Sequence, residues 1–263
     1  MSSPENETCF ILPNLEQKNL DNFLKHFLPL VNPRQLYVFT KKPKKVPRNV
    51  TQVIVDYYSA DYPKMANTVM KSDKREFICH LSDDVRFTKD WLPGMKQWAQ
   101  RGWVVSAGYC ETRDEEVFRK AAAATAENDS VVFGFYGACY FAKKEAFAKV
   151  GWLDETIDKQ WSDLDLFWRF YKGGVWPVVP RKITMQHFFG LTRRIPQSLR
   201  ETRAKEKAAK REFIAKHGRE AFNAIKAFFI TQGRYFSTFK RLTNNKGEQE
   251  RYLQNLKDKV YAG

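Results

Sequence analysis

Apolar and polar positions in the first hundred residues alternate between two patterns. Short apolar runs are separated by longer stretches in which apolar residues recur every three or four positions, the spacing of one helix face. Strands that alternate with helices predict an α/β protein with a mostly parallel sheet. The expected strands are 8–12, 35–40, 50–55, 76–81 and 103–108, and the expected helices are 15–28, 62–72 and 89–101.

The pattern is less regular after residue 113. Two apolar runs in this middle region predict a hairpin around Tyr136 and Gly137. Gly151 is expected to end one helix, and Gly218 to interrupt the last, basic one. The expected helices are 114–127, 143–150, 161–172 and 197–229, and the expected strands are 131–135, 138–141, 175–179 and 182–186.

Charge divides the 263 residues into two unequal parts. From Arg181 to Gly263 there are 20 Lys/Arg and 7 Asp/Glu, a net charge of +13. Residues 1–180 hold the remaining 25 basic and 23 acidic residues, a net charge of +2. Such asymmetry indicates an acidic partner, which is a nucleic acid, an anionic membrane surface or a polyanionic substrate. A solvated helical face without a partner is the alternative interpretation.

Composition excludes several classes of protein. Hydrophobic residues make up 43% of the chain, which allows a full core and argues against disorder. No apolar run approaches the roughly 18–20 residues that span a bilayer, and the first residues lack the pattern of a secretory signal. Cys9, Cys79, Cys110 and Cys139 lie far apart in apolar segments, which suits reduced thiols in a cytoplasmic protein better than disulfides or a zinc cluster.

An acidic turn follows the expected strand at 76–81. It consists of Ser82, Asp83 and Asp84, at the carboxyl end of a strand, where parallel sheets bind their ligands. Two adjacent carboxylates repel each other unless a cation lies between them. Hard oxygen ligands with free positions suit Mg²⁺ or Mn²⁺ bridging a diphosphate, and a solvated acidic turn is the alternative.

Two further groups are candidates for chemistry. Asp163 and Asp165 open the helix at 161–172, either as a general base or as acidic residues that favour a helix start. His187 ends a strand, where it binds a divalent metal or a diphosphate, or packs at a sheet edge. The sequence contains none of the motifs typical of P-loop, dinucleotide-binding, zincin or α/β-hydrolase proteins.

Taken in order, these segments resemble the family-2-like glycosyltransferases of the GT-A fold. Asp-Asp-Val followed by Trp-Leu is similar to the family's metal and nucleotide-sugar motif. Ser162-Asp163-x-Asp165 with Arg169 and Gly173 resembles its Glu-Asp-x-Asp block. The matching segments are FILPN, ICHLSDDVRFTKDWL, GACYFAKKEAFAKVGWLDE, WSDLDLFWRFYKGG and the later His187.

The resemblance covers about residues 8–195 and implies a fold and two domains. The implied fold is a GT-A-like, Rossmann-type α/β/α sandwich with a mostly parallel mixed sheet. Residues 1–195 would form the nucleotide-sugar-dependent catalytic domain, and residues 196–263 a basic helical extension packed on or beside it.

The resemblance also implies transfer of a sugar from a nucleoside-diphosphate sugar to an acceptor hydroxyl, with inversion at the anomeric carbon. A UDP-sugar is the first candidate for the donor. Mn²⁺ or Mg²⁺ would be held by Asp84, with Asp83 and His187 beside it. Asp163 would be the base and Asp165 the fallback base. The residues implied in nucleotide-sugar binding are Pro13, Asn14, Asp56, Asn67, Ser82, Gly137, Ala138, Arg193 and Arg194.

Three positions depart from the family pattern. Ser82 stands where the family often has Asp or Asn, and Ser162 stands where it has Glu. Thr40 and Lys41 replace the usual Asp after the second strand, so that Asp56 is expected to substitute for it.

The acceptor is inferred from charge. The basic last third favours DNA with a hydroxymethylated base, as in viral DNA modification. A glycan or lipid-linked acceptor at an anionic membrane, with peripheral membrane contact, is the alternative, and a non-catalytic nucleic-acid-binding module on a GT-A-like fold is the third. We expect a cytoplasmic protein, in the host cytoplasm if it is viral. The expected phosphate-binding residues are Arg203, Lys207, Lys210 and Arg211.

Overall fold

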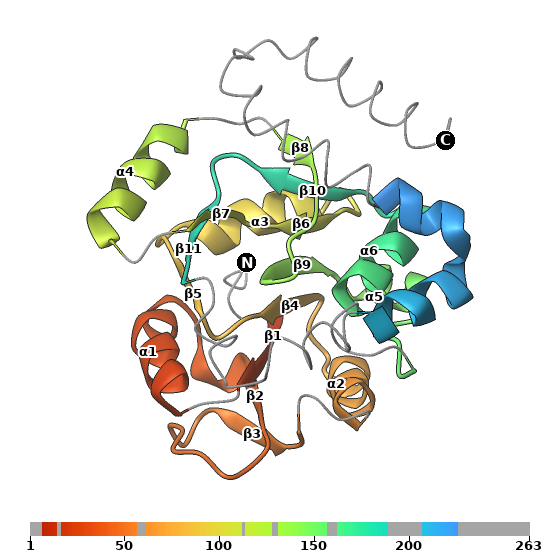
Figure 1. The fold of residues 1–263 in the computed structure, drawn as a ribbon. Helices are drawn as coiled ribbons and strands as arrows, with labels where there is room; N and C mark the ends of the chain where they lie inside the picture. The colour runs from red at the N-terminus through yellow and green to blue at the C-terminus, as the bar shows by residue number, and fades with distance from the viewer. Residues whose placement is uncertain are drawn as a thin grey trace.

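An eight-stranded mixed sheet forms the centre of the computed structural model (Figure 1). The structure describes residues 7–14, 17–56, 61–111, 114–127, 131–156, 162–188 and 207–225. The strands in spatial order are β3 (Thr51–Ile54), β2 (Leu36–Thr40), β1 (Thr8–Asn14), β4 (Phe77–Leu81), β9 (Cys139–Lys143), β6 (Val104–Ser106), β10 (Pro177–Pro180) and β8 (Val131–Phe133).

Most neighbouring strands of this sheet are parallel. β9 runs antiparallel to both β4 and β6, and β8 runs antiparallel to β10 at the edge. A smaller sheet of three strands, in the order β5, β11, β7, lies beside the large one. Its strands are β5 (Val85–Phe87), β11 (Thr184–His187) and β7 (Gly108–Glu111).

Helices pack on both faces of the large sheet and make a three-layer sandwich, as the sequence predicts. Two short 3₁₀ helices, Leu28–Leu30 and Pro33–Gln35, follow α1, and α4 packs beside β11. One face is covered by α1 (Gln17–Phe27) and α3 (Trp91–Ala99). The other face is covered by α2 (Asp61–Ser72), α5 (Lys144–Val150), α6 (Ser162–Lys172) and helical residues 207–225. The helix α4 spans Glu115–Thr125.

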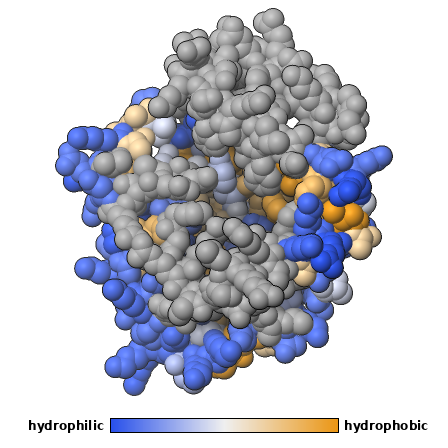
Figure 2. Space-filling view, viewed as in Figure 1, coloured by the Kyte–Doolittle hydropathy of each residue, from blue (hydrophilic) through white to orange (hydrophobic). Residues whose placement is uncertain are grey.

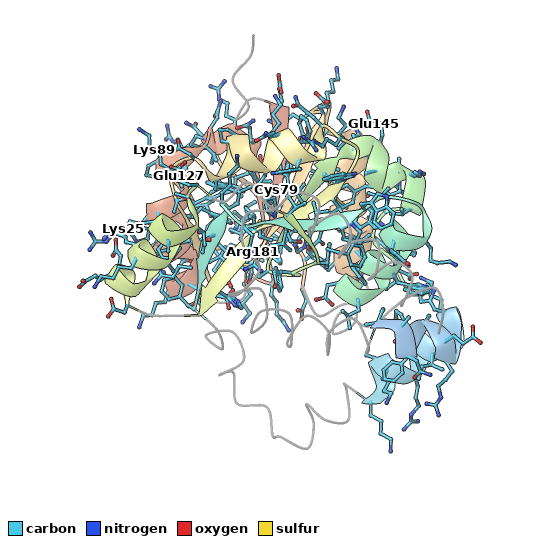
Figure 3. All side chains as sticks on the ribbon, turned by 90° about the horizontal axis from the view of Figure 1, so that it is seen from above. Lys25, Cys79, Lys89, Glu127, Glu145 and Arg181 are labelled. Carbon is cyan, nitrogen blue, oxygen red and sulfur yellow. The ribbon has the colours of Figure 1, made fainter. Side chains whose placement is uncertain are left out.

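The alternation along β1 explains why a core lies on each face. Phe10 and Leu12 join the cluster under α1 and α3, whereas Cys9 and Ile11 join the cluster under α2, α5 and α6. Successive side chains of a strand point to opposite faces, so a strand covered on both faces carries apolar residues at consecutive positions. Figure 2 shows mainly hydrophilic residues along the outer rim of the described surface. In Figure 3, Cys79 lies within the layers.

One expectation about local structure fails and two are confirmed. The hairpin around Tyr136 and Gly137 is wrong, because β8 pairs with β10 while β9 enters the centre of the sheet between β4 and β6. Gly151 ends α5 with a φ of 85°, and Gly218 interrupts residues 207–225 with a φ of 86°, a region that favours glycine. No helix within the described ranges has the length and apolarity needed to cross a bilayer.

The buried His80 on β4 predicts that the protein loses stability below neutral pH. His80 Nε2 lies 2.8 Å from the Tyr62 hydroxyl, and its ring stacks on Tyr140 at 4.7 Å. Burial lowers the pKa of His80 to about 3. An unfolded histidine binds a proton near pH 6.5, so the unfolded state binds more protons between these values. The contribution of His80 to the free energy of unfolding is therefore fully present above pH 6.5 and is lost as the pH falls toward 3.

We expect the free energy of unfolding to drop by about 2 kcal/mol between pH 7 and pH 5, as measured by urea denaturation. His80→Gln removes the titrating group and should flatten this dependence. His26→Gln is the control, because His26 lies partly exposed on α1 and its replacement should leave most of the slope. An equal slope in wild type and His80→Gln contradicts the assignment.

Candidate active site

The ends of β1 and β4 bring Asn14 and Asp83 together. The two strands are parallel, with Ile11 opposite His80, so the residues that follow them are neighbours. Asn14 Nδ2 donates a hydrogen bond to Asp83 Oδ2 at 2.5 Å, and both residues are buried. Pro13 precedes Asn14 in β1 and is buried as well. Two residues that the sequence assigns to donor and metal binding therefore meet at the expected edge of the sheet.

Asp84 and His187 also meet at this edge, although about a hundred residues separate them. His187 Nε2 lies 3.5 Å from Asp84 Oδ1, and the Ser82 hydroxyl donates to the same oxygen. The Phe188 amide donates to the Asp84 carbonyl at 2.8 Å, which fastens the end of β11 to the acidic turn. Burial alone would raise the pKa of Asp84, but the hydrogen bonds from His187 and Ser82 hold it below its ordinary value. Asp84 is therefore a carboxylate at neutral pH.

The donor set at this edge suits a divalent cation. Mn²⁺ accepts both carboxylate oxygen and imidazole nitrogen, and Asp84 and His187 present one of each. No group of three His, Cys, Asp or Glu side chains within the described ranges is arranged to hold a metal. Divalent ions at phosphate sites take one or two protein ligands and fill their other positions with phosphate oxygens and water. Asp84 and His187 therefore fit a cation that shares a diphosphate.

The turn before β9 connects the acidic turn to α6. The Ser82 amide donates to the Ala138 carbonyl at 2.8 Å, and the Tyr136 amide donates to Ser106 Oγ at 3.0 Å. Gly137 lies directly against Asp163, since a Cβ on this glycine would overlap Asp163 Oδ2 and stand 3.0 Å from its Cβ. Only glycine allows this approach. Contacts therefore run without a break from Asp84 to Asp163.

The first turn of α6 holds Asp163. Its Oδ1 accepts a hydrogen bond from the amide of the next residue, Leu164, at 2.9 Å. Burial, and in addition the nearby Asp163 carboxylate, raise the pKa of Tyr140 well above its ordinary value. Tyr140 thus presents a neutral hydroxyl group beside a carboxylate. The location of Asp163 is that of a group able to take a proton at the edge of the site.

Asp165 does not suit the role of fallback base that the sequence suggests. Its side chain has no exposed surface. Arg169 contacts one carboxylate oxygen, while Lys216 and His217 contact the other. A fully buried carboxylate that is held by three side chains cannot reach an acceptor hydroxyl. We therefore correct this expectation and assign Asp165 to the packing of α6.

Asn67 is also engaged in the fold instead of facing a nucleotide. Its amide nitrogen donates to the Leu153 carbonyl and to Glu155 Oε1, both at 2.9 Å, and its oxygen accepts from the Leu153 amide at 3.0 Å. These bonds hold the loop after α5, so we correct its assignment to donor binding. Asp56 forms an ion pair with Lys41 at 2.6 Å, and its contact with a nucleotide base stays a prediction.

The expected polyanion-binding residues are only partly described. Arg193, Arg194 and Arg203 lie outside the described residues. Lys207 and Arg211 are exposed on residues 207–225. Lys210 Nζ lies 4.3 Å from the centroid of the Phe222 ring, a cation–π contact within the same segment. The role of these residues in acceptor binding stays a prediction.

Three residues that support the site escape the sequence analysis. Ser106 holds the turn before β9, and its position as a polar residue near the end of the expected strand 103–108 is a signal that could have identified it. Lys216 and His217 reach Asp165 across about fifty residues, and no local pattern indicates that contact.

Solved structures share this fold, whereas no protein-family model and no curated protein matches the sequence. TarS of S. aureus is 10% identical, with a TM-score of 0.51 over 69% of this chain and 36% of TarS. A structure of TarS 1–349 is 11% identical, with a TM-score of 0.53 over 97% of this chain and 82% of that one.

The mannosyltransferase PcManGT from Pyrobaculum calidifontis, in complex with GDP-Man and Mn²⁺, is 14% identical. Its TM-score is 0.53 over 80% of this chain and 63% of the enzyme. GalNAc-T7 with UDP, GalNAc and Mn²⁺ is 7% identical, with a TM-score of 0.53 over 68% of this chain and 43% of that one. The chain thus spans 36% of the TarS chain and 63% of the PcManGT chain. At these identities the similarity establishes the architecture, and the chain has the fold of the GT-A-type glycosyltransferases.

Proposed function

We propose that the protein transfers a sugar from a nucleoside-diphosphate sugar to an acceptor hydroxyl, with Mn²⁺ or Mg²⁺ as the cofactor. A UDP-sugar is the first candidate for the donor. The unbroken path of contacts from Asp84 and His187 to Asp163 carries this proposal. This path links Asp84 and His187, the residues that would hold the cation, to the separate carboxylate of Asp163 in the first turn of α6. Proteins of the same fold hold GDP-Man with Mn²⁺ and UDP with Mn²⁺, which supports the donor class and the metal.

The acidic turn provides the donor side of the mechanism. Asp84 and His187 would hold the cation, which when bound supplies positive charge that stabilises the leaving diphosphate. Ser82 fixes the carboxylate of Asp84 through its hydroxyl group. Asn14 pairs with Asp83 and so keeps this second carboxylate turned toward β1. The turn is thereby ordered before a donor binds, which lowers the cost of binding it.

Asp163 provides the acceptor side. Its carboxylate takes the proton of the acceptor hydroxyl while that oxygen forms a bond to the anomeric carbon. The bond from this carbon to the diphosphate breaks, and the diphosphate leaves with both electrons. A single displacement of this kind inverts the configuration at the anomeric carbon. Gly137 leaves space for Asp163 beside the turn that contacts Ser82.

A donor screen tests the activity. UDP- and GDP-sugars are incubated with the protein and Mn²⁺, with and without duplex DNA that contains hydroxymethylated bases, and the release of nucleoside diphosphate is measured. We expect release from at least one donor that EDTA suppresses. Absence of turnover with every donor, with and without DNA, contradicts the proposal and favours a non-catalytic nucleic-acid-binding module.

We propose hydroxymethylated DNA as the acceptor, and the net charge of +13 on residues 181–263 supports it. The exposed Lys207 and Arg211 add positive charge to the surface of residues 207–225. A glycan or lipid-linked acceptor is the second candidate. It is favoured by the internal contacts of Lys210 and Lys216, which use part of the charge of this segment within the fold.

The salt dependence of DNA binding distinguishes the two acceptors. Each phosphate neutralised by the protein contributes about −0.9 to the slope of log binding constant against log salt. Replacing Arg203, Lys207, Lys210 and Arg211 by Gln should therefore flatten the slope by a few units, as measured by fluorescence anisotropy. Donor hydrolysis without acceptor should stay unchanged, because Asp84 and Asp163 lie in the near-neutral part of the chain.

Lys25→Gln with Lys89→Gln is the control for this experiment. Both lysines are exposed and lie at the outside of the sandwich (Figure 3), in the near-neutral part of the chain. The control should keep the wild-type slope. Weak binding to duplex DNA at low salt, or a preference for anionic vesicles over duplex DNA, would contradict the DNA acceptor. Either result would favour the glycan or lipid-linked acceptor.

A further inference from the structure

A buried carboxylate on α6, that of Asp165, connects residues 207–225 to the rest of the fold. Asp165 Oδ2 accepts a hydrogen bond from Arg169 Nε at 2.7 Å and forms an ion pair with Arg169 Nη2 at 2.6 Å. Asp165 Oδ1 contacts Lys216 Nζ at 2.8 Å and His217 Nε2 at 2.6 Å. We call Asp165, Arg169, Lys216 and His217 the Asp165 cluster. A buried charge is stable only when neighbouring groups of opposite charge or hydrogen-bond donors compensate for the water it has lost. Removing one partner therefore makes the buried carboxylate energetically costly.

The Asp165 cluster also reaches the end of α5. Arg169 Nη1 donates to the carbonyls of Val150 and Trp152, at 2.5 and 2.7 Å. Lys216 forms a second ion pair, with Asp154 in the loop after α5. Burial alone would raise the pKa of Asp154, but Lys216 and Thr156 hold it well below its ordinary value. Three segments of the chain therefore meet at the Asp165 cluster, and Figure 1 shows residues 207–225 beside α6.

The helical geometry links this cluster to Asp163. Residues two positions apart on an α-helix point to nearly opposite sides, since each residue turns the helix by about 100°. Asp165 accordingly faces residues 207–225, while Asp163 faces Gly137. Asp163 lies directly against Gly137 and belongs to the first turn of α6. A rotation or shift of this turn therefore moves the Asp163 carboxylate away from its place beside Gly137.

We propose that Lys216 and His217 are positioning residues for the reaction: by holding Asp165 they fix the first turn of α6 and thereby the location of Asp163. This inference rests on the proposed role of Asp163 as the base. It gives Lys216 and His217 a part in catalysis that is separate from any part that the exposed residues of this segment play in acceptor binding. An error of about 1 Å in the location of a catalytic group can lower the rate about a hundredfold.

Steady-state kinetics of Lys216→Met and His217→Ala test the proposal. We expect kcat to fall about 10- to 100-fold, with the KM for the donor within about twofold of wild type, because Asp84 and His187 are untouched. Lys216→Arg and His217→Gln keep a donor near Asp165 and should restore most of kcat. Arg219→Gln is the matched control, since Arg219 is exposed on the same segment and its loss changes the charge equally. It should keep the wild-type kcat.

A second measurement does not depend on activity. The carboxyl carbon signal of Asp163, assigned with Asp163→Asn, is recorded by NMR in wild type, Lys216→Met and Arg219→Gln. We expect it to move in Lys216→Met alone. Should Lys216→Met fail to fold, His217→Ala is compared with His217→Gln in the same way.

The two measurements separate the two proposals. An unchanged Asp163 signal together with wild-type kcat in a folded Lys216→Met, even with a lower Tm, overturns the inference and leaves the cluster a stabilising role only. A signal that moves in Lys216→Met, in a protein whose wild type turns over no donor, supports the positioning of Asp163 and contradicts the proposed function.

Discussion

Asp84→Ala is expected to abolish glycosyl transfer while the protein still folds. Asp84 is the carboxylate that lies next to His187 and that hydrogen bonds hold in its ionised form. Without it the cation that stabilises the leaving diphosphate loses a charged ligand, and cation charge of this kind is worth several kcal/mol in the transition state. The measurement is the release of nucleoside diphosphate from the preferred donor, with Tm and circular dichroism as the check on folding.

Asp83→Ala should weaken transfer less, because Asp83 is paired with Asn14. Asp90→Ala is the control, since Asp90 is an exposed carboxylate a few residues further along the chain. EDTA should stop the wild type, and added Mn²⁺ or Mg²⁺ should restore it. Full activity in excess EDTA, or a folded and active Asp84→Ala, contradicts a metal-dependent reaction.

The order of strands and helices was predictable where the local pattern is strong. The strands β1 and β4 are mostly apolar and buried at every position, because both faces of the central sheet are covered, and helices of clear periodicity separate them. The periodicity was less reliable for single residues. An apolar residue in a helical segment need not point inward: Met65 on α2 is 39% exposed, whereas Ala66 and Met70 lie on the buried face.

The middle of the sheet was not predictable in the same way. Two apolar runs next to each other in sequence favour a hairpin, but β9 pairs with β4 over five residue pairs and also with β6. The choice of partner depends on strands up to about sixty residues away, which local periodicity does not report. The three-stranded sheet was missed for a related reason, since β5 and β7 are short and depend on β11.

The candidate site was predictable where it lies at the ends of strands. Asp84 follows the carboxyl end of an expected strand, where parallel sheets bind ligands, whereas His187 reaches it only because β11 pairs with β5 in the three-stranded sheet, with His187 opposite Val85. The difference between Asp163 and Asp165 was not predictable. Both stand in the first turn of a helix, and only the arrival of Lys216 and His217 from residues 207–225 makes one of them a buried structural carboxylate.

Asp163→Asn is expected to lower kcat by about 10²–10⁴-fold, the contribution of a positioned general base. The substitution is nearly isosteric and removes only the group that accepts the proton. Gly137 can keep its close contact, and donor binding at Asp84 should remain. The measurements are kcat for transfer and the Kd of the donor with the cation, which should stay within about twofold of wild type.

Asp165→Asn provides the comparison, because it should act on stability. Removing the charge leaves Arg169, Lys216 and His217 around a neutral side chain, and breaking a buried pair in this way costs about 3–5 kcal/mol. We expect a lower Tm in Asp165→Asn and a wild-type Tm in Asp163→Asn. A nearly active Asp163→Asn beside an inactive, fully stable Asp165→Asn would assign the base to Asp165. The anomeric configuration of the product gives a further check: one base and one displacement require inversion, and a retained configuration excludes Asp163 as the single base.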